Sequence, residues 1–468
     1  MKLTSNSEDL AKDLQDLVNL FFKESEEPFE IFHEEKIKNN EVTNKFVLSG
    51  EKKGEYIKSF ELESRITDLH KKSLRKRKSK VQLYEILSSI TGKKLPWGSL
   101  TGIRPCKFAR DLVDRGEIKD HLITETLVNE YKLSMDKAKL VFQTLKNQKC
   151  IIRNDNLVDL YINIPICPTR CSYCSFISSE YKSVQNLIDT YIDCVIKELN
   201  AVKELVKEKA YIIRTVYIGG GTPTVLSAEQ LERLLKEILY QPTEFTVECG
   251  RPDTITRDKL EVLKKYGVTR ISINPQTFCE ATLKRIGRQH NNKDVLEAYS
   301  LALEYDFDIN MDIIAGLPLE KFGIFKRTIS RLLELYPQNI TIHTLSVKNS
   351  AVLKSEQETL EDKDVPKMVE YSLNELRKNG YEPYYIYRQK HQLGGLENVG
   401  YARDKKFCIF NIDSMEDISS IIAVGANGIS KRIYNYENKI EREQNCKFIQ
   451  DYINRIDEMI EKKFKLFS

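Results

Sequence analysis

The sequence predicts an α/β protein built on a parallel sheet, because six strand-like segments alternate with helix-like segments through the middle of the chain. Candidate strands are residues 159–165, 215–218, 244–248, 270–274, 308–314 and 339–345. Between them, residues 184–207, 228–239, 257–266, 293–304 and 322–335 have the apolar spacing of helices. This alternation is typical of parallel sheets with helical crossovers. The sheet is either doubly wound or a partial (β/α) barrel, and function is expected at the carboxyl ends of its strands.

The composition is that of an ordinary globular protein. A chain of 468 residues is long enough for two or three domains, and 41% hydrophobic with 30% charged residues is ordinary for a globular protein. The net charge of +4 is too small to indicate a partner. The first residues show no secretory signal, and no stretch approaches the length of a membrane span. Ten cysteines without a regular framework fit a reducing compartment, so we expect a cytoplasmic protein.

The most specific motif is Cys-Pro-Thr-Arg-Cys-Ser-Tyr-Cys, which places Cys167, Cys171 and Cys174 on one short loop after the first strand. Iron–sulfur clusters are held by thiolates, and a four-iron cluster has four ligand positions. A loop that supplies three thiolates leaves one iron open for chemistry, as catalytic zinc sites also keep one position open. A structural zinc site usually pairs two Cys or His units, whereas the other seven cysteines here are scattered singly. The motif therefore favours a cluster.

The second strand runs into Gly-Gly-Gly-Thr-Pro at residues 219–223. Taken alone, such a sequence is more typical of a turn, and neither a dinucleotide fingerprint nor a phosphate-binding loop is present. Its position after the strand next to the cysteine loop favours a cofactor contact, since glycines let a ligand approach the backbone amides.

Polar residues recur at the carboxyl ends of the later strands. They are Glu248, Gln276, Asp312 and His343. Ordinary solvated loops would scatter such residues along the strands. We therefore expect these four side chains to share one site with the cysteines.

On these residues the chain resembles the radical S-adenosylmethionine (SAM) superfamily, and within it the oxygen-independent coproporphyrinogen III oxidase group. The resemblance covers roughly residues 156–440 and rests on residues 161–165 before the cysteines, 219–223, 270–276, 310–312 and 316–318. It implies a partial (β/α)6 barrel with a 4Fe–4S cluster on Cys167, Cys171 and Cys174. We expect an N-terminal α+β accessory domain at 1–150, the barrel at 151–375, and a small C-terminal domain at 376–468 that covers the substrate.

The resemblance also implies roles for single residues. Gly220, Gly221 and Thr222 would contact the methionine moiety of SAM or a second bound cofactor. Tyr161, Tyr173 and Glu248 would lie along SAM, and Gln276, Arg288 and Asp312 would line the second cofactor or the substrate. From the residues alone, Arg288 is equally compatible with a cation at a helix C-terminus.

The family chemistry follows from its cofactor. SAM would fill the open iron position, and an electron passed into its sulfonium would release a deoxyadenosyl radical that abstracts hydrogen. The implied reaction is oxidative decarboxylation of coproporphyrinogen III to protoporphyrinogen IX in haem biosynthesis, with electron donor and acceptor unidentified. Residues 95–98 and 101–105, together with 387–390 and 396–401, resemble the coproporphyrinogen dehydrogenase branch.

Two departures keep a second hypothesis open, a haem-binding chaperone of the same family. Phe176 stands where well-characterised oxidases carry a further cysteine, as it does in the chaperones. The chaperones, however, carry His-Asn-x-x-Tyr-Trp where this chain reads Lys-His-Gln-Leu-Gly-Gly-Leu at 390–396. The lone His391 is more typical of a surface residue than of a haem ligand.

The N-terminal region contains helix-like stretches at 9–23 and 112–146, strand-like stretches at 46–48 and 55–62, and a basic run at 71–80. This run could contact nucleic acid or an acidic substrate, but Leu74, Val81 and Tyr84 keep a helical spacing that favours one solvated helix face. We therefore do not expect a nucleic-acid partner. Near the C-terminus, the resemblance gives residues 425–428 as a loop that closes the site, and 448–467 reads as a packing helix.

Overall fold

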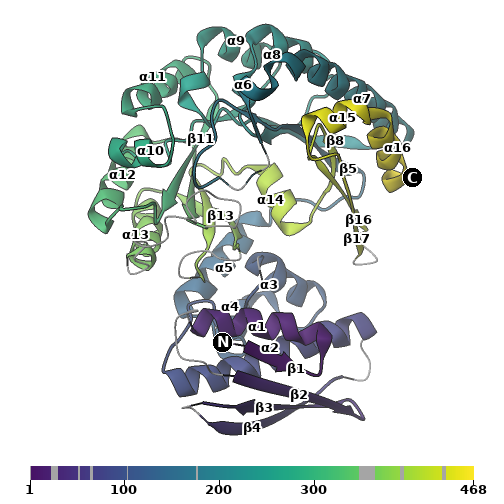
Figure 1. Cartoon of the computed structure of the whole chain (residues 1–468), viewed down its shortest axis with the longest axis vertical. Coiled ribbons are helices and arrows are strands. Elements are labelled where there is room, and N and C mark those ends of the chain that lie inside the picture. Colours follow the sequence, from purple (N-terminus) through teal and green to yellow (C-terminus); the bar gives the residue numbers. More distant parts are fainter. Residues whose placement is uncertain are drawn as a thin grey trace. The chain divides into compact units, whose positions relative to one another are not determined.

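The computed structural model describes residues 2–22, 30–50, 53–63, 67–102, 104–174, 176, 178–346, 364–389, 395–434 and 439–468. The chain divides into two compact units (Figure 1). Unit 1 is Met1–Gln143 with Gly394–Leu396, and unit 2 is Thr144–Leu393 with Glu397–Ser468. In the described part of the chain, no helix is long and apolar enough to cross a membrane.

Unit 1 is a four-stranded sheet covered by helices. Its elements are β1 (Lys2–Ser5), α1 (Glu8–Phe21), β2 (Glu30–Lys38), β3 (Glu41–Leu48), β4 (Gly54–Glu61), α2 (Asp68–Thr91), α3 (Pro105–Asp114), η1 (Asp120–Leu122), α4 (Ile123–Asn129) and α5 (Met135–Gln148), the last continuing into unit 2. The strands lie in the order β1-β2-β3-β4; β1 is parallel to β2 and the other neighbours are antiparallel. This arrangement is the α+β architecture that the sequence predicted for the N-terminal region.

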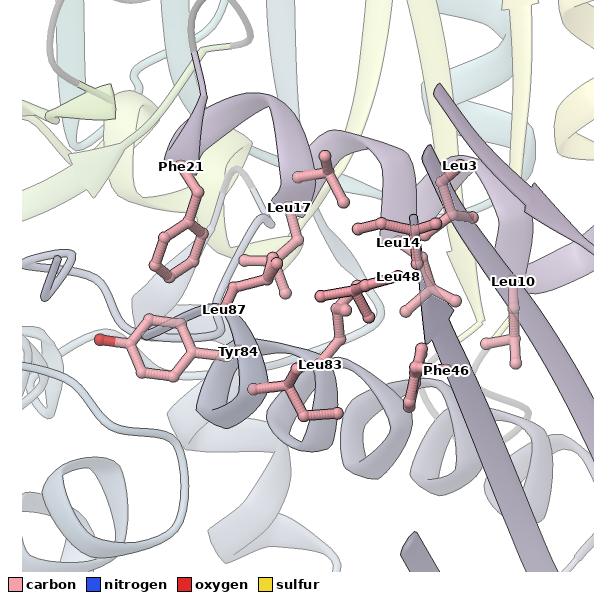
Figure 2. Packing of buried hydrophobic residues seen from close by; sticks show 13 residues of the cluster. Leu3, Leu10, Leu14, Leu17, Phe21, Phe46, Leu48, Leu83, Tyr84 and Leu87 are labelled. Atoms are coloured by element: carbon pink, nitrogen blue, oxygen red, sulfur yellow. The ribbon is translucent and has the colours of Figure 1, made fainter. Parts of the chain in front are cut away.

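The core of unit 1 lies between α1, α2 and one face of the sheet (Figure 2). Helix α1 buries residues spaced three and four apart, which places them on one helix face. The labelled members of this core are Leu3, Leu10, Leu14, Leu17, Phe21, Phe46, Leu48, Leu83, Tyr84 and Leu87. Complete burial of each leucine or phenylalanine contributes about 1.5–3 kcal/mol, so the face that packs is set by the apolar spacing.

The sequence predicted one helix over 112–146, and the structure corrects this to three. Helix α3 ends before Gly116, whose φ of 71° is left-handed, and α4 ends before Lys132, with φ of 64°. A left-handed residue cannot continue a right-handed helix, so each marks a reversal that apolar spacing alone does not reveal.

Unit 2 contains the predicted alternation of strands and helices. Its elements up to the last parallel crossover are β5 (Leu157–Ile164), β6 (Ile166–Cys167), β7 (Ser179–Glu180), α6 (Tyr181–Val184), η2 (Gln185–Leu187), α7 (Ile188–Glu208), β8 (Ile212–Gly220), η3 (Pro223–Val225), α8 (Ala228–Leu235), β9 (Glu244–Val247), η4 (Pro252–Thr254), α9 (Arg257–Lys265), β10 (Arg270–Ser272), α10 (Glu280–Arg285), α11 (Asn292–Leu303), β11 (Asp308–Ala315), α12 (Phe322–Leu335) and β12 (Asn339–Thr344). They are followed by α13 (Val365–Lys378), β13 (Glu382–Tyr387), β14 (Asn398–Ala402), α14 (Ile409–Glu416), β15 (Ser420–Val424), β16 (Ile429–Tyr434), β17 (Lys439–Gln444), α15 (Ile449–Asn454) and α16 (Ile456–Phe467).

The strand order of unit 2 decides between the two predicted architectures. The large sheet runs β13-β14-β12-β11-β10-β9-β8-β5-β15-β16-β17, so the six predicted strands are consecutive neighbours, and they are parallel. A doubly wound sheet would reverse its strand order at a switch point, which is absent here. The sheet is curved, with helices α7 to α12 along its outer side (Figure 1). This is the predicted partial (β/α) barrel.

The C-terminal residues extend both edges of this sheet. Strands β14 and β13 add antiparallel pairs beyond β12, whereas β15 pairs in parallel with β5 at the other edge and is followed by β16 and β17. The sequence predicted three parts with a boundary at residue 375, but the structure has two units. The reason is that backbone hydrogen bonds join the last hundred residues to the barrel sheet. The predicted helix at 448–467 is two helices, α15 and α16.

Candidate cofactor-binding site

A cavity of about 370 Å³ lies at the carboxyl ends of the six parallel strands. Each of these strands, or the segment directly after it, contributes to the lining. The predicted site residues that line it are Cys167, Cys171, Tyr173, Cys174, Gly220, Gly221, Thr222, Glu248, Gln276, Arg288 and Asp312. His343 also lines the cavity, so the four polar residues at successive strand ends lie together as predicted.

The cysteine loop is closed at its base by a short parallel pair, in which Cys167 of β6 is opposite Glu180 of β7. The loop is also tied to the barrel, because the Ser172 amide donates to the Ile286 carbonyl at 3.1 Å. All three cysteines are free thiols of intermediate burial. Burial raises the pKa of Cys167 and of Cys174 above that of an ordinary thiol. The loop thus presents its thiols to one cavity from a fixed backbone.

The donor set fits an iron–sulfur cluster. Among the described residues, no three Cys, His, Asp or Glu side chains converge tightly enough to bind one metal ion. A four-iron cluster binds each thiolate at a different iron, so its ligands stand farther apart than those of a single ion. The three sulfur atoms on this loop are the soft ligands that such clusters require. The Thr222 hydroxyl lies 3.7 Å from the Cys167 sulfur and can donate a hydrogen bond to it.

Close packing of the chain requires glycine at two positions of the segment that follows β8. A Cβ on Gly220 would lie 1.8 Å from Oδ1 of Asn163, and a Cβ on Gly221 would lie 2.5 Å from the Ile166 carbonyl oxygen. Gly220 also has a φ of 105°, which other residues rarely adopt. The segment therefore runs directly against the strand that leads to the cysteines, and its edge lines the cavity.

Glu248 follows β9 and is held at the glycine segment. Its carboxylate accepts hydrogen bonds from the Tyr217 hydroxyl at 2.6 Å and from the Gly220 amide at 3.2 Å. Burial raises the pKa of Glu248 to about 7, against the lowering effect of the Tyr217 hydrogen bond, and nearby Asp312 raises it further. Glu248 is therefore poised to lose its proton when a cation arrives.

Asp312 of β11 is the centre of a hydrogen-bonded group. Its two carboxylate oxygens accept from the side-chain amides of Asn274 at 3.0 Å and Asn310 at 2.8 Å. His343 Nε2 lies 3.5 Å away, and the other ring nitrogen is 3.1 Å from the Tyr387 hydroxyl. Burial raises the pKa of Asp312, but the contact with His343 and the hydrogen bonds from Asn310 and Thr341 outweigh it, so the pKa lies below its ordinary value. Asp312 is thus an ionised carboxylate at neutral pH.

Arg288 links the cysteine loop to the opposite wall. Its guanidinium donates to the Gly250 carbonyl at 3.0 Å and to the Tyr173 hydroxyl at 3.1 Å. Tyr173 lies between Cys171 and Cys174 in the sequence. Arg288 therefore lines the cavity, and it also closes the C-terminal turn of α10, because its amide donates to the Leu283 carbonyl at 2.9 Å after the left-handed Gly287.

Gln276 has an unusual backbone. Its φ of 63° is left-handed for a residue with a side chain, and it is held there by exchange of backbone hydrogen bonds with β11. Such strain is kept where the surrounding structure fixes it, often at functional sites.

Among the predicted cluster ligands and cofactor contacts, only Tyr161 does not line the cavity. Its hydroxyl donates to Asn163 Oδ1 at 2.9 Å, and its ring packs nearly parallel to the rings of Tyr217 and Phe410, which stack directly on each other. Any effect of Tyr161 on the cavity therefore passes through Tyr217 and the glycine segment.

Other predicted positions differ in how they relate to the cavity. Phe176 lines it and is 68% exposed. The loop at 425–428 is hydrogen-bonded to α7 and β5: the Gly425 amide donates to Glu198, and the Asn163 side chain donates to the Ala426 carbonyl. The residues of this loop are not among the described residues that line the cavity. His391 lies outside the described residues.

Several lining residues were missed by the sequence analysis. They include Arg251, Asn274, Asn310, Thr341, Tyr385, Tyr387, Asn398, Asn411 and Met415. For Tyr385 and Tyr387, the alternation of two tyrosines on one strand was a usable signal, since residues two apart share a face. The others depend on the pairing of distant strands.

Comparison with known proteins identifies the family. The family model described as the Radical SAM superfamily matches residues 161–332, from β5 into α12. The oxygen-independent coproporphyrinogen-III oxidase-like protein HemZ of Bacillus subtilis (strain 168) is 34% identical over 479 residues, covering 97% of this chain and 95% of HemZ. The heme chaperone HemW of Lactococcus lactis is 34% identical over 260 residues, covering 52% of this chain and 66% of HemW.

The fold is also similar to a solved structure, coproporphyrinogen III oxidase (HemN) from Escherichia coli. The TM-score is 0.52 at 22% identity, with 68% of this chain and 73% of that chain covered. Radical SAM proteins use a 4Fe–4S cluster and SAM, and the three thiols at the cavity fit that chemistry. The chain belongs to the radical SAM superfamily, in its HemN-like group.

Proposed function

We propose that this protein catalyses the oxygen-independent oxidative decarboxylation of coproporphyrinogen III to protoporphyrinogen IX, a step of haem biosynthesis. The observation that carries the proposal is similarity to the oxidase-like HemZ along 97% of the chain, which includes unit 1 as well as the barrel. A single cavity with thiols, two half-buried carboxylates and hydroxyl-bearing aromatic rings supports it.

In this proposal the cofactors are held by the predicted residues. Cys167, Cys171 and Cys174 would hold the cluster, and the glycine segment with Glu248 would bind SAM. When bound, these groups supply a deoxyadenosyl radical that removes one hydrogen atom from the substrate. The Tyr217 ring, which stacks on Phe410 at 4.4 Å, would help to keep water from this part of the cavity.

The substrate side is proposed at the same carboxyl ends, toward the other edge of the sheet, on β11, β12 and β13. His343, oriented by Asp312, would donate a hydrogen bond to a propionate of the substrate. Each propionate would lose one hydrogen atom to the radical, its carboxylate as carbon dioxide, and one electron to an acceptor. Two propionates become vinyl groups, so two electrons must leave to an external electron acceptor.

The deciding experiment is an anaerobic assay of the reconstituted protein with SAM, a low-potential reductant, an electron acceptor and coproporphyrinogen III. We expect deoxyadenosine and protoporphyrinogen IX together, with both absent when SAM is omitted. Deoxyadenosine without a porphyrin product would overturn the substrate while leaving radical chemistry intact.

A second candidate is a haem chaperone, favoured by Phe176 in the cysteine loop and by 34% identity to HemW. It predicts stoichiometric haem binding without porphyrin turnover. A haem titration followed by its visible spectrum, repeated with the His391→Ala variant, separates the candidates. Binding that depends on His391, with no product in the assay above, would favour the chaperone.

A further inference from the structure

Most of the basic run on α2 is neutralised within unit 1. Arg75 bonds to Asp9 and lies 2.8 Å from a carboxylate oxygen of Glu35, and Lys76 lies 3.2 Å from Asp13. The run is helical, as predicted. The expectation of one solvated face is wrong, because several of its charged side chains form ion pairs with other residues of unit 1. These ion pairs cancel much of the positive potential that nucleic acid would require.

Two residues of the run, Arg77 and Lys80, instead line a small cavity of about 90 Å³ together with Arg104. Phe108 and Tyr131 also line it, and its lining includes no carboxylate among the described residues; the uncharged residues that complete it are Ser99, Leu100, Gly102 and Pro105. A neighbouring cavity of about 620 Å³ is lined by acidic and basic groups alike and favours neither sign. The small cavity therefore differs from its neighbour in having only positively charged side chains among its charged lining residues.

Arg77 has unused hydrogen-bonding capacity at this place. The side chain is 8% exposed, and one terminal nitrogen lies 3.2 Å from Glu117, but its Nε has no hydrogen-bond partner. The guanidinium carbon lies over the Phe108 ring at 5.7 Å from the centroid, a cation–π contact. A buried donor without an acceptor is costly, so an acceptor in the cavity would be stabilised.

Lys80 gives the second observation. Its ammonium donates to the Thr101 hydroxyl at 3.2 Å. Burial lowers the pKa of Lys80, against the opposing effects of Asp13 and Asp16. An anion beside Lys80 would restore its preference for the charged form.

Helix α3 points its N-terminus toward the same cavity. The helix begins at Pro105 and has ten residues, and Arg104 at its N-cap makes no side-chain capping bond. Pro105 and Phe108 of this helix line the cavity. The partial positive charge of a helix N-terminus adds to that of the three side chains.

We propose that this cavity binds one oxyanion group, a carboxylate or a phosphate, through Arg77, Lys80 and Arg104. The volume accepts a single such group and not a tetrapyrrole ring, so this site is separate from the reaction cavity of unit 2. The aromatic rings suit a ligand whose anionic end enters the cavity while an apolar part lies against Phe108 and Tyr131. The site would let a small anionic metabolite stabilise unit 1.

The only tryptophan of the chain makes the proposal testable. Trp97 is buried, and its carbonyl accepts from the amide of Leu100, which lines the cavity. Its fluorescence is measured on the reconstituted full-length protein during titration with inorganic phosphate and, separately, with propionate. Chloride keeps the ionic strength constant. We expect a saturable change, and the active titrant tells whether phosphate or carboxylate is preferred.

The variants Lys80→Gln and Arg104→Gln should weaken binding roughly ten-fold or more, because each removes a charge-assisted hydrogen bond. Lys78→Gln is the matched control: Lys78 lies on the same helix, is exposed, and does not line this cavity. No saturable change with either anion, or equal weakening in the control, would overturn the proposal.

A second measurement avoids any variant that fails to fold. Lysine acylation of the wild-type protein is mapped by mass spectrometry with and without phosphate or propionate. Bound anion should protect Lys80 relative to Lys78. Equal labelling of Lys80 with and without both anions would contradict the site.

Discussion

His343 Nε2 lies 3.5 Å from Oδ2 of Asp312, across the neighbouring parallel strands β12 and β11. The second ring nitrogen of His343 contacts the Tyr387 hydroxyl on β13 at 3.1 Å. An ionised carboxylate, an imidazole and a phenol thus follow one another along the cavity wall. A carboxylate in this position fixes the orientation of an imidazole.

Replacement of His343 by alanine should lower kcat/KM for coproporphyrinogen III by roughly 10- to 100-fold. The loss follows from removing one charge-assisted contact to a substrate propionate. The measurement is porphyrin product formed anaerobically per reconstituted cluster. His121→Ala, an exposed histidine of unit 1, is the control and should retain turnover. Unchanged turnover in the His343 variant would remove this residue from the substrate side.

The polar residues of the site could be predicted from sequence because each parallel strand is a short apolar run with a polar residue at or near its carboxyl end. Glu248, Asp312 and His343 all follow this rule, and all line the cavity. Tyr161 shows its limit: it lies on the first strand, but its side chain turns into a stack with Phe410, a residue far along the chain. Such a contact depends on where α14 packs, which local spacing does not encode.

The pairing of the strands at the edges of the large sheet also could not be predicted from local sequence patterns. The register of β15 against β5 pairs Val424 with Ile162, two segments widely separated in sequence. Its apolar run predicts a strand but not its partner. The Asp312–His343–Tyr387 series is complete only because β14 and β13 add antiparallel to β12, so the alternation of Tyr385 and Tyr387 indicates a shared strand face but not the site that it lines.

Replacement of Cys171 by alanine should abolish the broad visible absorbance of the reconstituted cluster, because a three-thiolate site loses one of its protein ligands. SAM cleavage should fall to background. Cys150→Ala is the matched control, since Cys150 is exposed and distant in sequence from the loop. Full cluster content in the Cys171 variant would contradict the ligand assignment.

SAM binding should strengthen as the pH rises from 6 to 8. Glu248 has a pKa of about 7 in the ligand-free protein, so it is mostly protonated at the lower pH and mostly ionised at the higher one. An ionised carboxylate attracts the sulfonium cation of SAM, which predicts an affinity gain of up to about ten-fold over this interval.

Equilibrium dialysis of labelled SAM at the two pH values tests this dependence. Glu248→Gln should bind weakly at both pH values, whereas Glu261→Gln, at an exposed position on α9, should keep the wild-type pH profile. The same rise with pH in Glu248→Gln would assign the titration to another group.

Replacement of Asp413 by asparagine should stabilise the protein at alkaline pH. Asp413 of α14 and Asp159 of β5 are buried around one guanidinium, with Arg214 2.5 Å from Asp413 and the Thr215 hydroxyl 2.7 Å from Asp159. Burial raises the pKa of both carboxyls, and the charge of Asp159 raises that of Asp413 further. The folded state therefore holds a proton that the unfolded chain releases, and its contribution to stability is lost as the pH rises through the folded-state pKa.

Asparagine keeps an oxygen for Arg214 and removes the second negative charge, so the variant should match the wild type near pH 6 and exceed its stability near pH 9. We expect a difference on the order of 1–3 kcal/mol at the higher pH, since one pKa unit corresponds to about 1.4 kcal/mol. Thermal unfolding of both proteins at equal cluster content measures it. Asp457→Asn, at an exposed position on α16, should show no such pH-dependent gain. A variant less stable than the wild type by the same amount at both pH values would mean that both carboxylates are ionised in the folded protein and that Arg214 needs them both.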